Sequence, residues 1–161
     1  MSSDALSLSA RALLVDARTI ARSNFYHVLE PEHIFRALMA SSFAATYQVF
    51  KTYRPTPIIR QWLIDKLGVG QAIFKRGETI AMGARASHIL SLALLVAAMR
   101  GSRFITEGDL VLAFVYDGND SRALIDEYID DVPGLVRHTL QSLGEKPNLE
   151  MEETLLAGHG H

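Results

Sequence analysis

The sequence contains no cysteine, which excludes disulfides, thiolate metal sites and cysteine nucleophiles. It has no G-x-x-x-x-G-K-S/T phosphate loop and no G-x-S-x-G nucleophile elbow. The most apolar run, residues 89–99, is about half as long as a membrane span. The polar N-terminus lacks the charged-then-apolar pattern of a signal peptide. We therefore expect a cytoplasmic protein that is not an enzyme and has no catalytic residues.

The chain also lacks a strong charge of either sign, because 16 basic residues oppose 18 acidic ones and the formal net charge is −2. A nucleic-acid-binding domain usually carries a basic face, so no nucleic acid or membrane partner is expected. Six histidines are present, but none of the dispersed ones forms an i, i+4 pair or an H-E-x-x-H motif. We expect no metal and no cofactor.

The sequence repeats itself at an offset of 76 positions, with no gap. Identical residues fall into register along both halves, and like-for-like apolar pairs lie between them. An internal repeat defines the structural unit of a fold. The identical pairs are Ala10/Ala86, Leu14/Leu90, Ala17/Ala93, Ala21/Ala97, Ala37/Ala113, Pro57/Pro133, Leu67/Leu143 and Gly68/Gly144.

Apolar residues recur at three- and four-residue spacing, which is typical of amphipathic helices. No stretch alternates with period two between hairpin turns, so a sheet is not expected. The sequence predicts an all-α fold of two tandem four-helix repeats related by a pseudo-twofold axis. We place one domain at 1–145, with repeats at 5–69 and 81–145, and a flexible linker or tail at 146–161. The expected helices lie near 6–23, 31–40, 43–53, 57–67, 84–99, 121–129 and 133–143, with one more opening after a capping box at Thr106–Asp109.

The second helix reads Pro31-Glu32-His33-Ile34-Phe35-Arg36-Ala37-Leu38-Met39, and the corresponding part of the other half reads Arg100–Thr106 and then Leu110–Phe114. With the duplication, these motifs resemble the Clp N-terminal domain of the Clp/Hsp100 AAA+ unfoldases and disaggregases. The resemblance covers about residues 5–144. It implies a non-catalytic module that recruits unfolded or tagged client proteins, or adaptors carrying them, to the ATPase ring.

In one branch of that family, the Glu of a Glu-His motif in each repeat binds phosphorylated arginine on clients. The resemblance places the first such residue at Glu32. The second position holds Gly108, with Asp109 where His would stand. The resemblance therefore supplies only one of the two glutamates of a phosphoarginine reader.

Seven residues form the candidate protein- or peptide-binding set. Glu32 and His33 can form a recognition site at an exposed helix start, or Glu32 can act as a capping residue beside a histidine that hydrogen-bonds locally. Thr106 and Asp109 present the same two alternatives. Phe25 and Tyr26 are adjacent aromatics on a connection, where they can anchor a partner or cover the edge of the core. Phe104, in the Arg100–Thr106 stretch, completes the set.

Three functions are compatible with the residues. The first is the binding domain of a Clp-type AAA+ machine, joined to the ring in the same chain or acting on it in trans. The second is a stand-alone adaptor or regulatory scaffold with the same fold and a dedicated protein partner. The third is a small helical enzyme or ligand carrier, which would need a polar constellation inside the core, whereas the predicted inward positions are almost all apolar.

Overall fold

The structure is a computed structural model that describes residues 5–40, 45–53, 69–75, 77–118 and 120–159. The helix expected over 57–67, and the start of the one expected from Phe43, lie outside the described residues. The described elements are α1 (Leu8–Ser23), β1 (Val28–Leu29), α2 (Pro31–Ala40), α3 (Ala45–Tyr53), β2 (Ala81–Met82), α5 (Ala84–Met99), α6 (Glu107–Tyr116), α7 (Asp120–Tyr128), α8 (Val132–Ser142) and α9 (Leu149–Ala157).

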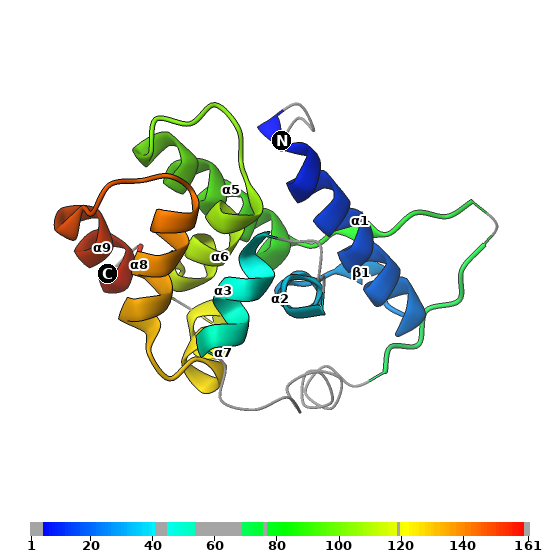
Figure 1. Cartoon of the computed structure of the whole chain (residues 1–161). Coiled ribbons are helices and arrows are strands. Elements are labelled where there is room, and N and C mark those ends of the chain that lie inside the picture. The colour runs from blue at the N-terminus through cyan, green and yellow to red at the C-terminus, as the bar shows by residue number, and fades with distance from the viewer. Residues whose placement is uncertain (1–4, 41–44, 54–68, 76, 119, 160–161) are drawn as a thin grey trace.

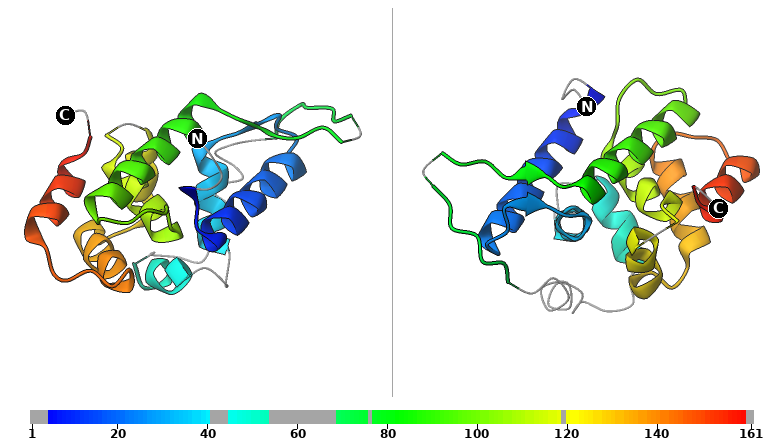
Figure 2. Two further views of the ribbon diagram at one scale, coloured as in Figure 1. Left: turned by 90° about the horizontal axis from the view of Figure 1, so that it is seen from above. Right: turned by 180° about the vertical axis from the view of Figure 1, so that it is seen from behind.

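The helices pack around one apolar core, and Figures 1 and 2 show how they are arranged. Helix α1 packs on α2, α5 packs on α6, and α2 contacts α5. Phe35 of α2 and Phe114 of α6 meet edge to face in this core, with ring centroids 5.4 Å apart, and both side chains are fully buried. The predicted all-α fold is confirmed, and so are the predicted inward faces of α1 and α2. Buried predicted positions include Leu13, Leu14, Ile34, Leu38, Met39, Ile89, Leu90 and Leu110.

Two short backbone pairings join the halves of the chain reciprocally. Leu29 pairs with Met82 in the parallel β1–β2 ladder, and Ile105 pairs with Leu6 in an isolated parallel bridge. The carbonyl of Leu29 accepts the Gly83 N–H at 3.1 Å, and the carbonyl of Ile105 accepts the Ser7 N–H at 2.9 Å. Each residue of one pairing lies 76 positions from its counterpart in the other. Contacts of this reciprocal form are typical of elements related by a twofold axis.

The ladder also differs from the expectation that no sheet would form. Strands of two residues are too short to leave a period-two pattern in the sequence, which is why they were missed. The bounds of α1 and α2 recur 76 residues later as those of α5 and α6. A complete tandem repeat of four helices stays a prediction, since residues 54–68 lie outside the described residues.

Side-chain caps fix where several helices begin. Ser7 Oγ accepts the Ala10 N–H at 3.1 Å at the start of α1. At the start of α6, Thr106 Oγ1 accepts the Asp109 N–H at 3.3 Å, while Asp109 Oδ2 accepts the Thr106 N–H at 2.9 Å. This capping box was predicted from the sequence, with Asp in place of the usual Glu or Gln.

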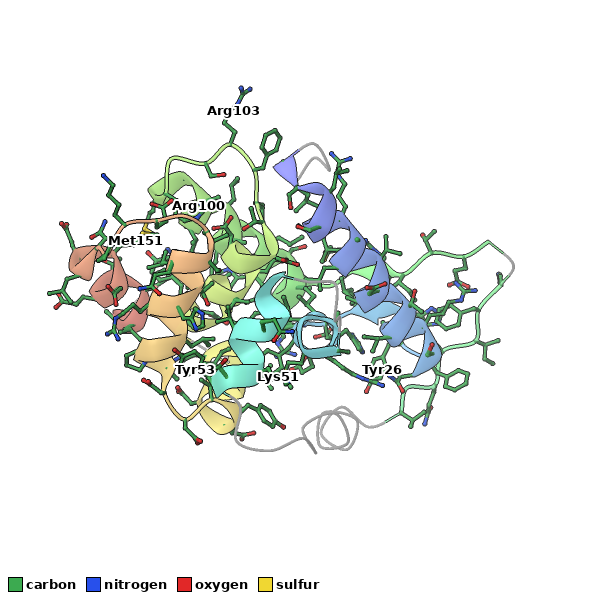
Figure 3. All side chains as sticks on the ribbon, viewed as in Figure 1. Tyr26, Lys51, Tyr53, Arg100, Arg103 and Met151 are labelled. Carbon is green, nitrogen blue, oxygen red and sulfur yellow. The ribbon has the colours of Figure 1, made fainter. Side chains whose placement is uncertain are left out.

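The C-terminal segment corrects the expectation of a flexible linker over 146–161. Helix α9 begins after Asn148, whose side chain accepts the Met151 N–H at 3.1 Å, and it packs on α6 and α8. Met151 and Leu155 are buried one turn apart, and Figure 3 shows Met151 on this helix beside α8. The acidic residues between them obscured this short i, i+4 apolar face in the sequence.

Candidate functional site

An open cleft of about 420 Å³ lies where the N-terminal half of α5 meets the end of α6 and the start of α7. Its walls carry charged and polar groups rather than the aliphatic side chains of the core. Two further carboxylates, which belong to the connection after β1 and to the start of α2, contact one of the side chains that line the cleft. The cleft is lined by Ala84, Arg85, His88, Asp117, Asp120 and Ser121.

Arg85 is the centre of the charge cluster at this cleft. Its Nη2 donates to Glu32 Oε1 at 2.8 Å and its Nη1 donates to Glu30 Oε2 at 3.0 Å. Asp120 Oδ2 lies 3.9 Å from Nη2. Burial lowers the pKa of Arg85, but the hydrogen bond and charge of Glu32 outweigh it, so the pKa is raised above its usual value. The guanidinium thus ties α2 to α5 while its side chain stays 44% exposed.

The cleft carries more negative than positive charge. Glu30, Glu32 and Asp120 surround Arg85, and Asp117 Oδ1 lies 3.7 Å from His88 Nε2. Glu32 and Asp120 lie in the first turns of α2 and α7, where the helix dipole favours a carboxylate. The arrangement therefore suits a cationic group, such as the side chain of a lysine or arginine, more than an anion.

The sequence suggested that Glu32 lies at an exposed helix start, but in the structure it does not. Its side chain is only 9% exposed, because Arg85 covers the carboxylate. Arg85 lies 53 residues further along the chain, so only the tertiary fold brings the two together. The expectation of a freely exposed Glu32 was wrong for this reason, although the carboxylate does border the cleft through Arg85.

His33 is fully buried and has a structural role. Its Nδ1 accepts the Glu30 N–H at 2.9 Å, and the Tyr26 ring lies edge-on at 5.0 Å. Burial lowers the pKa of His33 to about 4, with Glu32 opposing this shift, so the imidazole is neutral at pH 7. A neutral imidazole that accepts at Nδ1 carries its proton on Nε2, which is buried without a hydrogen-bond partner among the described residues. Of the two alternatives for His33, the histidine that hydrogen-bonds locally is confirmed, and the exposed recognition residue is not.

Asp109 occupies the position 76 residues after His33 and makes the corresponding hydrogen bond to its N-cap backbone. It is fully buried, and Arg100 contacts it in a bidentate pair, Nε to Oδ1 and Nη2 to Oδ2, both at 2.8 Å. Arg100 also lies 3.3 Å from Glu145. Thr106 and Asp109 thus meet as a capping box, and Asp109 presents no free carboxylate to a partner.

The three aromatic candidates lie on two connections. Phe25 is 51% exposed and has a φ of 62°, which is unusual for a residue with a bulky side chain. The position 76 residues later is Gly101, with a φ of 73°. Tyr26 is half-buried against His33, so it covers the core edge, and burial followed by the nearby Glu32 raises its pKa. Phe104 is half-exposed and, like Phe25, is open to contact.

A family profile described as the Clp repeat (R) N-terminal domain matches residues 5–127, which is most of the chain. The chain belongs to the Clp N-terminal domain family. Domains of this family bind substrates or adaptors of Clp ATPases and are themselves non-catalytic. No curated protein matches this Clp N-terminal domain closely enough in sequence to count as a relative.

Solved structures share the fold of this Clp N-terminal domain at low sequence identity. The N-terminal domain of ClpD from Arabidopsis thaliana is 12% identical, with a TM-score of 0.57, covering 97% of this chain and 98% of that chain. The N-terminal domain of the ClpV1 ATPase from E. coli is 17% identical, with a TM-score of 0.60 and coverages of 96% and 83%. A chain studied as part of a malarial protein secretion system is 18% identical, with a TM-score of 0.62 and coverages of 95% and 90%.

Gly108, at the position of the second motif glutamate in this Clp N-terminal domain, packs closely against Leu143. A Cβ added to Gly108 would lie 2.8–3.0 Å from three side-chain carbons of Leu143 in α8. Carbon atoms at that distance overlap, so a side chain at this position would have to displace the side chain of Leu143. A glutamate cannot be placed there without moving Leu143.

The sequence reasoning missed four residues of the cleft: Arg85, His88, Asp117 and Asp120. Arg85 carried one available signal, because the position 76 residues earlier is Ser9, so this cation breaks the repeat. Among the described residues, no group of three histidines or acidic residues is arranged to hold a metal ion. No helix in the described part of the chain is long and apolar enough to cross a membrane.

Proposed function

We propose that this domain binds client polypeptides, unfolded or tagged, or adaptors that carry them, on behalf of a cytoplasmic Clp-type AAA+ ring. The ring is either part of the same protein or a separate one. The acidic, open cleft around Arg85 carries the proposal. It lies at the junction of α2, α5 and α7, and carboxylates around it can receive a cationic side chain from outside.

Binding at the cleft proceeds by exchange. Arg85 has a long, partly exposed side chain, so it can swing into solvent while a lysine or arginine of the client takes its place on Glu32 and Glu30. One charged pair replaces another, so the net binding free energy gained at each site is small. Weak single contacts suffice in a ring, since several tethered domains raise the effective concentration of the client.

Phosphoarginine is a second candidate ligand, because Glu32 stands where a glutamate binds it in one branch of the family, although the surplus of carboxylates in the cleft opposes its phosphate. Glu32 can accept the guanidinium of the ligand, while Arg85 and His88 supply cationic or donor groups for its phosphate. The site is single, because Gly108 supplies no second carboxylate.

Fluorescence anisotropy tests both ligands on the same protein. A permanently unfolded, labelled model protein is titrated with the wild-type domain, with Glu32→Gln and with Glu153→Gln, a control on the exposed side of α9. We expect saturable binding that Glu32→Gln weakens and Glu153→Gln leaves unchanged. Competition by free phosphoarginine, and not by arginine, assigns the cleft to the modified residue. Absence of binding by the wild type would overturn the proposal.

The alternative of a stand-alone adaptor or regulatory scaffold keeps the same binding surface but changes its context. AAA+ motifs following the domain in the same reading frame would place it in an ATPase. A dedicated partner recovered by pull-down, with no response to unfolded clients, would favour the scaffold.

A further inference from the structure

After α9 the chain returns to the end of α6, where Asp117 lines the cleft. His159 pairs with Asp117 in an isolated parallel bridge, and the His159 N–H donates to the Tyr116 carbonyl at 2.6 Å. The rings of Tyr116 and His159 meet edge to face, with centroids 5.3 Å apart. Gly158, with a φ of 88°, turns the chain out of α9 and into this pairing. We call Gly158 and His159 the strap.

Arg122 joins the helices that meet at the strap. Its Nη1 donates to the Val115 carbonyl at 3.2 Å and to the Leu156 carbonyl at 3.0 Å, so it links the last turns of α6 and α9. Arg122 belongs to α7, two residues after Asp120, which lines the cleft. The end of α6, the start of α7 and the end of α9 therefore form one hydrogen-bonded junction beside the cleft.

The acidic residues of the cleft and the helix that leads to the strap depart from the 76-residue repeat together. The positions 76 residues before Asp117 and Asp120 hold Ser41 and Ala44, which carry no charge. The positions that correspond to α9 are 73–81, and the described residues among them form no helix. Cleft and strap are thus features of the second half of the chain and not of the shared repeat.

We propose that the strap couples the cleft to the C-terminal end of the domain, so that attachment of the strap to α6 and binding of a client favour each other. Asp117 makes both contacts. Its backbone pairs with the strap, and its Oδ1 lies 3.7 Å from His88 Nε2 at the cleft. The attached strap fixes the Asp117 backbone and so holds this carboxylate where it attracts a cationic client side chain.

The coupling acts in both directions. A client that binds the held carboxylate more tightly than the released one shifts the strap toward its attached state, because coupling between two sites is reciprocal. Occupancy of the cleft is thereby communicated to the residues after α9. The inference rests on the proposed function and adds to it a means by which binding is sensed elsewhere in the protein.

Two substitutions at one position test the strap. His159→Pro removes the N–H that donates to Tyr116, since proline has no backbone N–H, whereas His159→Ala keeps it and removes only the ring. In the anisotropy titration with the labelled unfolded protein, His159→Pro should weaken binding by about fivefold or more, and His159→Ala by clearly less. Arg137→Ala is the control, because it removes a contact of α8 to Glu152 of α9 without touching the strap, and it should bind as the wild type does.

Hydrogen exchange measured by NMR gives a second readout, which a merely structural role would not move. In the wild type, saturation with the unfolded protein should slow exchange of the His159 amide. Reciprocity requires this factor to match the loss of affinity in His159→Pro. The Met151 amide, which donates to Asn148 at the start of α9, should exchange at the same rate with and without the client.

Unchanged affinity in His159→Pro, or unchanged exchange of the His159 amide on saturation, would overturn the inference. Equal losses in His159→Pro and Arg137→Ala would overturn it as well, since any loosening of α9 would then have the same effect. The wild-type titration separates the two claims. Client binding that the strap variants leave intact removes only the coupling, whereas absence of binding by the wild type contradicts the proposed function.

Discussion

Replacing Arg100 by alanine should destabilise this fold far more than replacing Arg85 by alanine, although both arginines contact a carboxylate at 2.8 Å. The two pairs differ in burial. Arg100 and Asp109 are 6% and 0% exposed, whereas Arg85 and Glu32 are 44% and 9% exposed. Burial decides the cost because water can replace a lost partner only where it reaches the remaining charge.

Removing Arg100 leaves the Asp109 carboxylate buried, with Thr106 as its one remaining donor residue in the part of the chain that the structure describes. Breaking a buried pair in this way costs about 3–5 kcal/mol, and the two remaining donors place the expectation near about 3 kcal/mol. Removing Arg85 opens Glu32 to the cleft and to solvent, so the loss should stay at about 1 kcal/mol or less. This difference in stability cost matters for function, since only a weakly held ion pair can exchange its arginine for an incoming client residue.

Urea unfolding followed by circular dichroism gives the free energy of unfolding for the wild type, Arg85→Ala and Arg100→Ala under one set of conditions. Arg137→Ala is a matched control, because Arg137 is exposed and contacts Glu152 at 3.1 Å. We expect the free energy of unfolding of Arg100→Ala to lie well below that of the other three proteins. An Arg85→Ala loss equal to that of Arg100→Ala would refute the exchange mechanism, because Arg85 would then be a fixed structural residue.

Three further predictions concern stability. Leu38 is fully buried in α2, so Leu38→Ala should lower the free energy of unfolding by roughly 2–5 kcal/mol in the same urea assay, and a neutral result would contradict the packing of this helix. His33 has a folded pKa of about 4 and binds a proton more readily when unfolded; stability should therefore fall as the pH drops from about 6.5 toward 4, by about 2 kcal/mol between pH 7 and 5. Urea titrations at both pH values should show this component in the wild type and not in His33→Gln; equal pH dependence in the two would show that His33 is not the group responsible. Gly108→Glu should destabilise the fold by about 1–3 kcal/mol through overlap with Leu143, and should not create a second phosphoarginine site by calorimetry. Unchanged stability with a second site would show that α6 and α8 separate easily.

Much of the fold could be predicted because it depends on local spacing. The inward faces of α1, α2 and α5 follow from apolar residues three and four apart, and the Thr106–Asp109 box marks the start of α6. Helix α9 was missed because only Met151 and Leu155 show its apolar face among acidic neighbours. The β1–β2 ladder was missed because its register depends on contacts between the two halves.

The candidate site was harder to predict from the sequence for a related reason. Glu32 was identified, but its environment is set by Arg85, which only the tertiary fold brings to it. His33 and Asp109 read as polar residues near helix starts, and the sequence does not show that both helices begin inside the core. For Phe25, in contrast, the sequence did hold a signal, because the 76-residue offset aligns this aromatic with Gly101. Both residues adopt a positive φ.

The most direct test of client binding at the cleft is an NMR titration of the labelled domain with an unfolded client rich in lysine and arginine. The account predicts saturable amide shifts at residues 30–32, 85–88 and 120–121, with weaker binding and smaller shifts at the same residues in Glu32→Gln and the buried Arg100–Asp109 pair unaffected throughout. Binding that shifts only residues remote from Arg85 would contradict the account, as would shifts at the cleft that persist in full in Glu32→Gln.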